Sequence, residues 1–149
     1  MSEDDFVGCL AGNLRAAART VSRLYDDALH KSGLRITQLA VLAQVRRSEP
    51  VTASELAAAM SAERSGTARD LKLLEAGGLV RARPRTTDRR AREYSLTDLG
   101  RSRLRKAAPA WRLAQAQARE YIGAEAVDDL VALTIGVVER VPTRTDAAS

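Results

Sequence analysis

The chain has 149 residues, of which 45% are hydrophobic and only 3% aromatic, and its formal net charge is +5. A single cysteine excludes an intramolecular disulfide framework and a zinc knuckle. No run approaches the roughly 20 apolar residues of a membrane span, and the acidic start MSEDD is unlike a signal peptide, so we expect a cytoplasmic protein with no membrane partner.

The first predicted element is a long helix over residues 5–31, with Gly33 as its C-cap. At ~1.5 Å per residue this helix would be about 40 Å long, which is more than a small domain needs for its own core. Its apolar residues recur at alternating steps of four and three, as in helices that pack against other helices: Leu10, Leu14, Ala17, Val21, Leu24 and Ala28.

A second helix is predicted to start near Thr37, as its cap, and to end at Glu49-Pro50. A third, short helix follows Thr52, whose hydroxyl can form a capping box with Glu55.

A fourth helix is predicted from Ser61, which recaps the chain, to about Ala76, and Gly77-Gly78 ends it. Two short helices joined by a tight turn in this way are typical of a helix-turn-helix. Residues 79–83 and 91–96 then alternate in polarity around a polar turn, which predicts a β-hairpin.

Two further helices complete the predicted order. Thr97 and Asp98 cap a helix that extends toward Tyr121, with a kink at Pro109. A final amphipathic helix follows Gly123. The sequence therefore predicts a mostly α fold with a small β-hairpin, organised as one domain over residues 1–149.

The terminal helices carry more apolar surface than the central lobe, residues 35–97, requires. We expect the helices over 5–33 and 98–141 to bury that surface by self-association, and residues 142–149 to form a flexible tail. The interface candidates are Leu10, Leu14, Val21, Leu24, Val131, Ile135 and Val138. The alternative is that these residues belong to the intramolecular core.

Positive charge is concentrated in one stretch. Between Arg81 and Lys106 there are ten basic and three acidic residues, a balance of +7, so the rest of the chain carries 5 − 7 = −2. A local basic patch of this kind favours a polyanionic partner, although a solvated arginine-rich face would give the same count.

Three motifs in order carry a resemblance to a known family. They are LEAGGLV at Leu74–Val80, TDRRA at Thr87–Ala91 and YSLTDLG at Tyr94–Gly100. With this spacing, the chain resembles the MarR family of bacterial regulators over essentially its whole length. The resemblance implies a winged helix-turn-helix, a homodimer and binding to an inverted repeat in double-stranded DNA.

The resemblance also implies roles for individual residues. Arg64, Ser65, Thr67 and Arg69 would contact bases or phosphates from the helix that enters the major groove. Asp88 would orient Arg90, which enters the minor groove. Further arginines of the hairpin would flank it on the DNA backbone: Arg83, Arg85, Arg89 and Arg92. Gly66, Thr67 and Asp70 depart from the family pattern, which puts the operator sequence in doubt.

The sensor is the least defined part. By resemblance, a small aromatic effector could bind near Tyr25, His30, Arg46 and Trp111, each of which could equally be a packing residue. Cys9 is an alternative redox sensor, since a helix N-terminus favours a thiolate, but lone cysteines are usually small buried hydrophobes. We expect the chain to be a transcription regulator that acts as a repressor, and that a ligand or an oxidant releases it from DNA.

Two other functions compete with this one. A winged-helix module could bind protein instead of DNA, which the basic patch argues against. An enzyme has little support, because the single histidine, His30, has no nucleophile or acid near it in sequence, and there is no metal-ligand cluster or phosphate-binding loop. We expect no cofactor and no metal.

Overall fold

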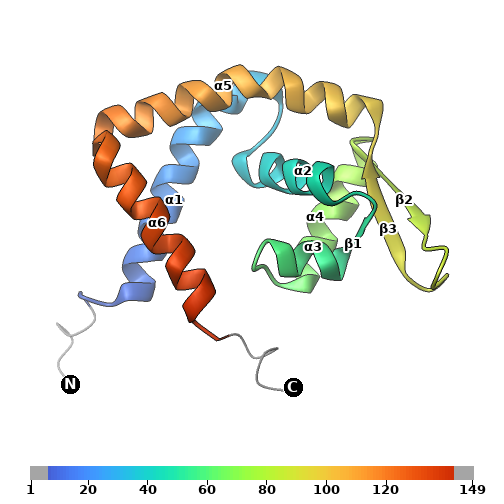
Figure 1. Cartoon of the computed structure of the whole chain (residues 1–149). Coiled ribbons are helices and arrows are strands. Elements are labelled where there is room, and N and C mark those ends of the chain that lie inside the picture. Colours follow the sequence, from blue (N-terminus) through green and yellow to red (C-terminus); the bar gives the residue numbers. More distant parts are fainter. Residues whose placement is uncertain (1–6, 143–149) are drawn as a thin grey trace. The chain divides into compact units, whose positions relative to one another are not determined.

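The computed structural model describes residues 7–142 (Figure 1). It confirms a mostly helical fold with a small antiparallel sheet. The helices are α1 (Leu10–Leu29), α2 (Ile36–Ser48), α3 (Ala53–Ala59), α4 (Arg64–Ala76), α5 (Asp98–Ile122) and α6 (Ala124–Arg140), with a short 3-10 helix η2 (His30–Ser32) after α1. The strands are β1 (Val51–Thr52), β2 (Val80–Pro84) and β3 (Arg92–Leu96).

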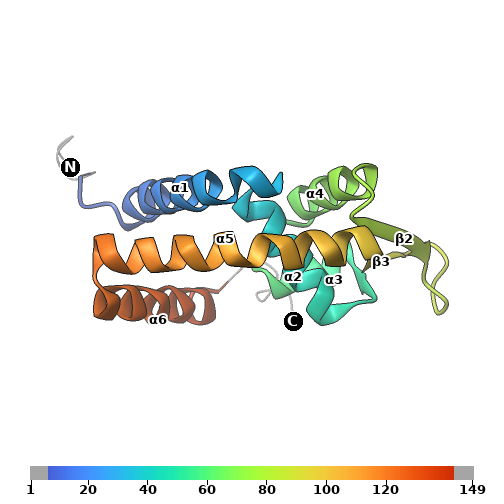
Figure 2. The ribbon, with the colours of Figure 1, turned by 90° about the horizontal axis from the view of Figure 1, so that it is seen from above.

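The chain divides into two compact units within α5. The first unit extends to Ala114 and contains α1 to α4, the sheet and the first part of α5. The second unit begins at Gln115 and contains the end of α5 and α6. In two perpendicular views, the hairpin of β2 and β3 projects from one end of the first unit, opposite α1 (Figures 1 and 2).

The core of the first unit is built from branched aliphatic side chains, because the chain has few aromatic residues. Helices α1 to α4 and strands β2 and β3 each contribute, so the helix-turn-helix and the hairpin share one core. The largest side chains with essentially no exposed surface are Leu29, Leu42, Val45, Leu56, Leu71, Leu74, Val80 and Leu96.

In the connection from α1 to α2, one predicted helix cap is confirmed and another is wrong. Gly33 has φ of 71° and ends η2 in the left-handed conformation, as predicted for a C-cap. Thr37 lies inside α2 and does not cap it. Instead, Asp26 of α1 accepts a hydrogen bond from the Ile36 amide at 2.7 Å, so a side chain ten residues away satisfies this helix start.

Other predicted helix ends are confirmed. Thr52 Oγ1 accepts from the Glu55 amide at 3.2 Å while the Glu55 carboxylate accepts from the Thr52 amide at 2.9 Å. Thr97 Oγ1 accepts from the Gly100 amide at 3.0 Å and so caps α5. Gly78, with φ of 70°, follows α4.

The sheet has one strand that the sequence did not indicate. The predicted hairpin pairs β2 with β3 from Val80 opposite Leu96 to Pro84 opposite Arg92. Strand β1 adds to the other side of β3, so that the order is β1-β3-β2. Two residues are too few for an alternating pattern to predict a strand.

The start of α4 also differs from the prediction. The helix begins at Arg64 after Glu63, and Ser61 has φ of 50° in the turn that follows α3. Ser61 therefore belongs to the turn of the helix-turn-helix and does not recap the helix.

Helix α6 of the second unit is exposed along most of its length. Val131, Ile135 and Val138, which lie on one face at helical spacing, expose 51, 53 and 57% of their surface. Arg119 at the end of α5 binds Asp128 through two hydrogen bonds, at 2.5 and 3.3 Å, which holds the turn around Gly123.

Candidate nucleic-acid interface

Helix α4 has a buried face and a polar outward face. Its side chains at Thr67, Leu71 and Leu74 are buried in the core of the first unit. On the opposite side, Ser65, Arg69 and Lys72 follow at spacings of four and three residues, so they share one exposed face. Lys72 was not among the predicted contacts, although the helical period counted from Ser65 would have found it.

Two predicted contacts of α4 need correction or refinement. Thr67 is only 4% exposed and its hydroxyl donates to the Glu63 carbonyl at 3.0 Å, so the prediction that it is an exposed contact residue is wrong. The reason is that Thr67 shares the helix face of Leu71 and Leu74. Arg64 is exposed at the first position of the helix, to one side of the face that Ser65 and Arg69 define.

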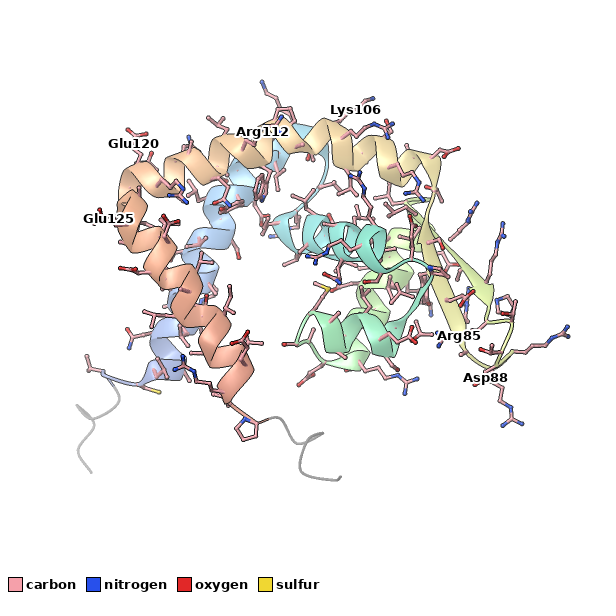
Figure 3. The ribbon with its side chains drawn as sticks, in the orientation of Figure 1. Arg85, Asp88, Lys106, Arg112, Glu120 and Glu125 are labelled. Carbon is pink, nitrogen blue, oxygen red and sulfur yellow. The ribbon has the colours of Figure 1, made fainter. Side chains whose placement is uncertain are left out.

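The hairpin β2–β3 with its turn, hereafter the wing, ends in a tight turn built by Asp88. Its carboxylate accepts a hydrogen bond from the Arg90 amide at 3.0 Å, and its carbonyl accepts from the Ala91 amide at 3.0 Å. Asp88 therefore orients Arg90 through the backbone, and no ion pair joins the two side chains among the described residues. Figure 3 shows Asp88 at the tip of the wing, with side chains projecting outward around it.

Two arginines of the wing, where its strands meet the turn, are already paired within the chain. Arg85 Nη1 lies 2.8 Å from a carboxylate oxygen of Glu55, and its Nε lies 3.6 Å from Glu93. Arg92 binds Glu75 at 3.0 Å. These ion pairs join the wing to α3 and α4, so Arg85 and Arg92 position the wing in the structure as it stands.

A second group of basic side chains has no ion-pair partner within residues 7–142. In the wing these are Arg81, Arg83, Arg89 and Arg90, and on α4 they are Arg64, Arg69 and Lys72. All of them are exposed. The sequence count treated the arginines as one patch, whereas the structure pairs Arg85 and Arg92 of the wing with carboxylates and leaves the other basic side chains of the wing and of α4 without an ion pair within residues 7–142.

The link between α3 and the wing makes a pH-dependent contribution to stability. A hydrogen bond from the Thr52 backbone, and then one from Arg85, lower the pKa of Glu55 below its ordinary value of 4.5. A carboxylate with a lowered folded pKa stabilises the fold above its unfolded pKa, and this contribution is lost as the pH falls through the folded value.

We expect Glu55→Gln to lower the melting temperature at pH 7, because glutamine can keep the cap but not the ion pair with Arg85. The difference from the original chain should shrink as the pH falls below about 4.5, as thermal unfolding followed by circular dichroism would measure. Glu120→Gln, at an exposed position of α5, is the control. A Glu55→Gln difference equally large at pH 7 and pH 3 would contradict this origin.

The predicted sensor residues differ in burial, and of the four that could line a ligand site only His30 lines the pocket described below. Tyr25 is buried in the core, where burial raises its pKa, while Arg46 and Trp111 are exposed on α2 and α5. His30 lines an open pocket of about 600 Å³ with Asp26, Asp27, Gly33, Leu34 and Arg35. Cys9 is exposed directly before α1, so it is not the buried hydrophobe of the alternative interpretation.

The predicted interface residues fall into two groups. Leu10 is 66% exposed, and Val131, Ile135 and Val138 are exposed on α6. Val21 packs against the core of the first unit, while Leu14 and Leu24 are half-buried on α1. The predicted residues of α1 therefore lie partly in the core and partly on the surface. Those of α6 form an exposed apolar face.

Comparison with known proteins establishes the family. A model of the MarR family matches residues 32–91. Crystal structures of the M. tuberculosis transcriptional regulator MosR, one of them in complex with DNA, share 35% identity with the chain. Each alignment covers 89% of this chain and 97 or 99% of the MosR chain, and both TM-scores are 0.74. This chain belongs to the MarR family.

More distant structures agree on the fold of this MarR-family chain. A mutant of E. coli MarR complexed with operator DNA has a TM-score of 0.80 at 20% identity, with 92% of this chain and 99% of that chain covered. Bordetella bronchiseptica BpsR, described by the regulation of its DNA binding by 6-hydroxynicotinic acid, has a TM-score of 0.80 at 18% identity, with 92 and 97% covered. No curated protein sequence matches the chain.

Membership places the chain among DNA-binding transcription regulators with a winged helix. Within residues 7–142, no helix is long and apolar enough to cross a membrane. The same residues contain no group of three histidine, cysteine or acidic side chains that could hold a metal ion.

Proposed function

We propose that this chain is a homodimeric repressor that binds an inverted repeat in double-stranded DNA. The observation that carries the proposal is the division of its basic side chains: those of α4 and most of those of the wing are exposed and have no ion-pair partner within residues 7–142, whereas Arg85 and Arg92 are neutralised. Unpaired cations next to an exposed helix face can neutralise phosphates while polar side chains reach base edges.

Each part of this surface has a proposed role. Helix α4 enters the major groove, where Ser65 and Arg69 contact base edges. Lys72 lies on the same face of the helix, and Arg64 contacts the phosphates beside this face. The tip of the wing enters the minor groove with Arg90, flanked by Arg83 and Arg89 on the backbone. Arg85 and Arg92 hold the wing through Glu55 and Glu75, so they act on DNA binding indirectly.

The dimer is proposed from the exposed apolar face of α6 and from Leu10. Exposing a contiguous apolar face of this kind to water is unfavourable. A second copy of the chain would cover the face without any other partner. A twofold axis would set two α4 helices about one duplex turn apart, ~34 Å, which is the reason for expecting an inverted repeat.

Release from DNA is proposed to follow a small ligand or an oxidant. Two observations support a ligand. 6-hydroxynicotinic acid regulates the DNA binding of BpsR, and His30 lines an open pocket in this chain. The oxidant is supported by the exposed thiol of Cys9. Selection of bound sites from genomic DNA, repeated with phenols and with peroxide, distinguishes the two inputs.

A salt titration of binding to the selected duplex tests the proposal. If the unpaired basic side chains of both subunits neutralise phosphates, the logarithm of the association constant should fall with that of salt at a slope steeper than about −4, since each phosphate contributes about −0.9. Fluorescence anisotropy of the labelled duplex measures this slope. A winged-helix module that binds only protein would show no such binding, and the proposal would be wrong.

A further inference from the structure

Gly66 is the third residue of α4, between Ser65 and the turn that carries Arg69. Its backbone is helical, and the glycines with positive φ are Gly33, Gly78 and Gly123. Any residue could adopt the conformation of Gly66. The backbone therefore gives no reason for a glycine here.

Packing gives no reason either. A Cβ atom built on Gly66 meets no other atom within 4 Å. Gly100 shows the contrast, because a Cβ there would collide with the backbone of Leu79. A helical glycine weakens the helix relative to alanine, so Gly66 lowers stability without any compensation inside the chain.

Gly66 is half-buried, and its open side lies at the edge of the exposed face of α4. Gly66 is next to Ser65 and seven residues before Leu73, so it shares a helix face with Leu73, which is 62% exposed. The buried residues Thr67, Leu71 and Leu74 lie on another side of the helix. Gly66 thus opens a small gap in the outward surface beside the side chains that the proposed function directs at DNA.

We propose that Gly66 is a point of closest approach between α4 and DNA, where the bare backbone lets the helix lie deep enough in the major groove for Ser65 and Arg69 to reach base edges. The inference rests on the proposed function and adds a specificity-determining position to it. Hydrogen bonds to bases require distances of about 2.7–3.2 Å, so a methyl group that lifts the helix by roughly 1 Å breaks them. The glycine would then be retained for binding at a cost in stability.

The test measures stability and affinity on the same variant, because the inference predicts opposite signs. Gly66→Ala should raise the melting temperature by about 1–4 °C, since it removes the helix penalty without a clash. It should weaken binding to the selected duplex by about tenfold or more, by loss of base contacts. Calorimetry and anisotropy at fixed salt measure the two effects.

Gly12→Ala is a matched control. Gly12 is also the third residue of an exposed helix start, in α1, and a Cβ there meets only the Cβ of Cys9, at an ordinary 3.8 Å. This variant should gain similar thermal stability and keep its affinity for the duplex. Gly66→Leu provides a graded second variant, which should bind more weakly than Gly66→Ala because its side chain is larger.

The outcomes separate the inference from the proposed function. If the original chain binds the selected duplex and Gly66→Ala binds equally well, the inference is wrong and the proposed function stands. Equal losses in Gly66→Ala and Gly66→Leu would point to helix stiffness, and a lower melting temperature in Gly66→Ala would point to a structural role; both overturn the inference. If the original chain binds no duplex, the proposed function itself fails.

Discussion

Arg90→Ala is expected to weaken binding to the selected duplex by about 30-fold or more. One arginine that reads a groove is worth about 1–3 kcal/mol, and a dimer loses two of them, so the cost is about 2–6 kcal/mol. The side chain is exposed at the tip of the wing and has no ion-pair partner within residues 7–142, so its removal should leave the fold intact. Anisotropy gives the affinity, and a thermal melt checks the fold.

Two arginine variants make this prediction specific. Arg19→Ala removes the same charge from an exposed position of α1, at the other end of the first unit from the wing, and should change affinity little (Figure 1). Arg85→Ala removes an arginine that Glu55 and Glu93 already neutralise, so it should lower stability more than it lowers the salt slope. Arg90→Ala with undiminished affinity would remove Arg90 from the interface.

Ile135→Glu is expected to raise the dissociation constant of the proposed dimer at least about a hundredfold. The substitution puts a charge in the middle of the apolar face of α6, and two such charges would be buried without partners in a symmetric dimer. Sedimentation equilibrium measures the dissociation constant. Operator affinity should fall in parallel, because a monomer presents only one α4 helix to the duplex.

Ala126→Glu is the control for this variant, since it adds the same charge to an exposed position of α6 nine residues before Ile135, on the opposite side of the helix. It should leave self-association unchanged. If Ile135→Glu sediments as the original chain does, the apolar face of α6 is not the dimer interface, and another surface must account for any dimer.

Local patterns predicted most of the fold, because they depend on interactions between near neighbours. The capping box of Thr52 and Glu55 lies within one helical turn, and the alternation of β2 and β3 sets the register around one short turn. The double glycine after α4 needs only its own backbone freedom. Such signals are contained in a few consecutive residues.

The errors arose where distant residues decide. Asp26 caps α2 across ten residues, which made the cap prediction for Thr37 wrong. The division of the wing arginines depends on Glu55 and Glu75, which α3 and α4 bring to the wing from earlier in the chain. A charge count cannot distinguish these arginines from the unpaired ones. Thr67 is an exception, because its burial follows from the helical spacing that it shares with Leu71 and Leu74, which the prediction overlooked.

The family motifs have a physical basis that the sequence alone did not reveal. Thr97 Oγ1 donates to the Gly78 carbonyl at 2.6 Å and accepts from the Gly100 amide, while Gly100 leaves room for the Leu79 backbone. The end of α4, the wing and the start of α5 are therefore tied at one junction. This junction fixes the base of the wing beside α4.

A hydroxyl-radical footprint of the chain on its selected duplex tests the central proposal most directly, namely that α4 and the wing tip of two subunits engage one stretch of DNA. We expect protection symmetric about the centre of an inverted repeat, with two major-groove contacts about one turn apart and minor-groove protection outside them that disappears in Arg90→Ala. Protection at a single unpaired half-site, or a pattern unchanged in Arg90→Ala, would contradict it.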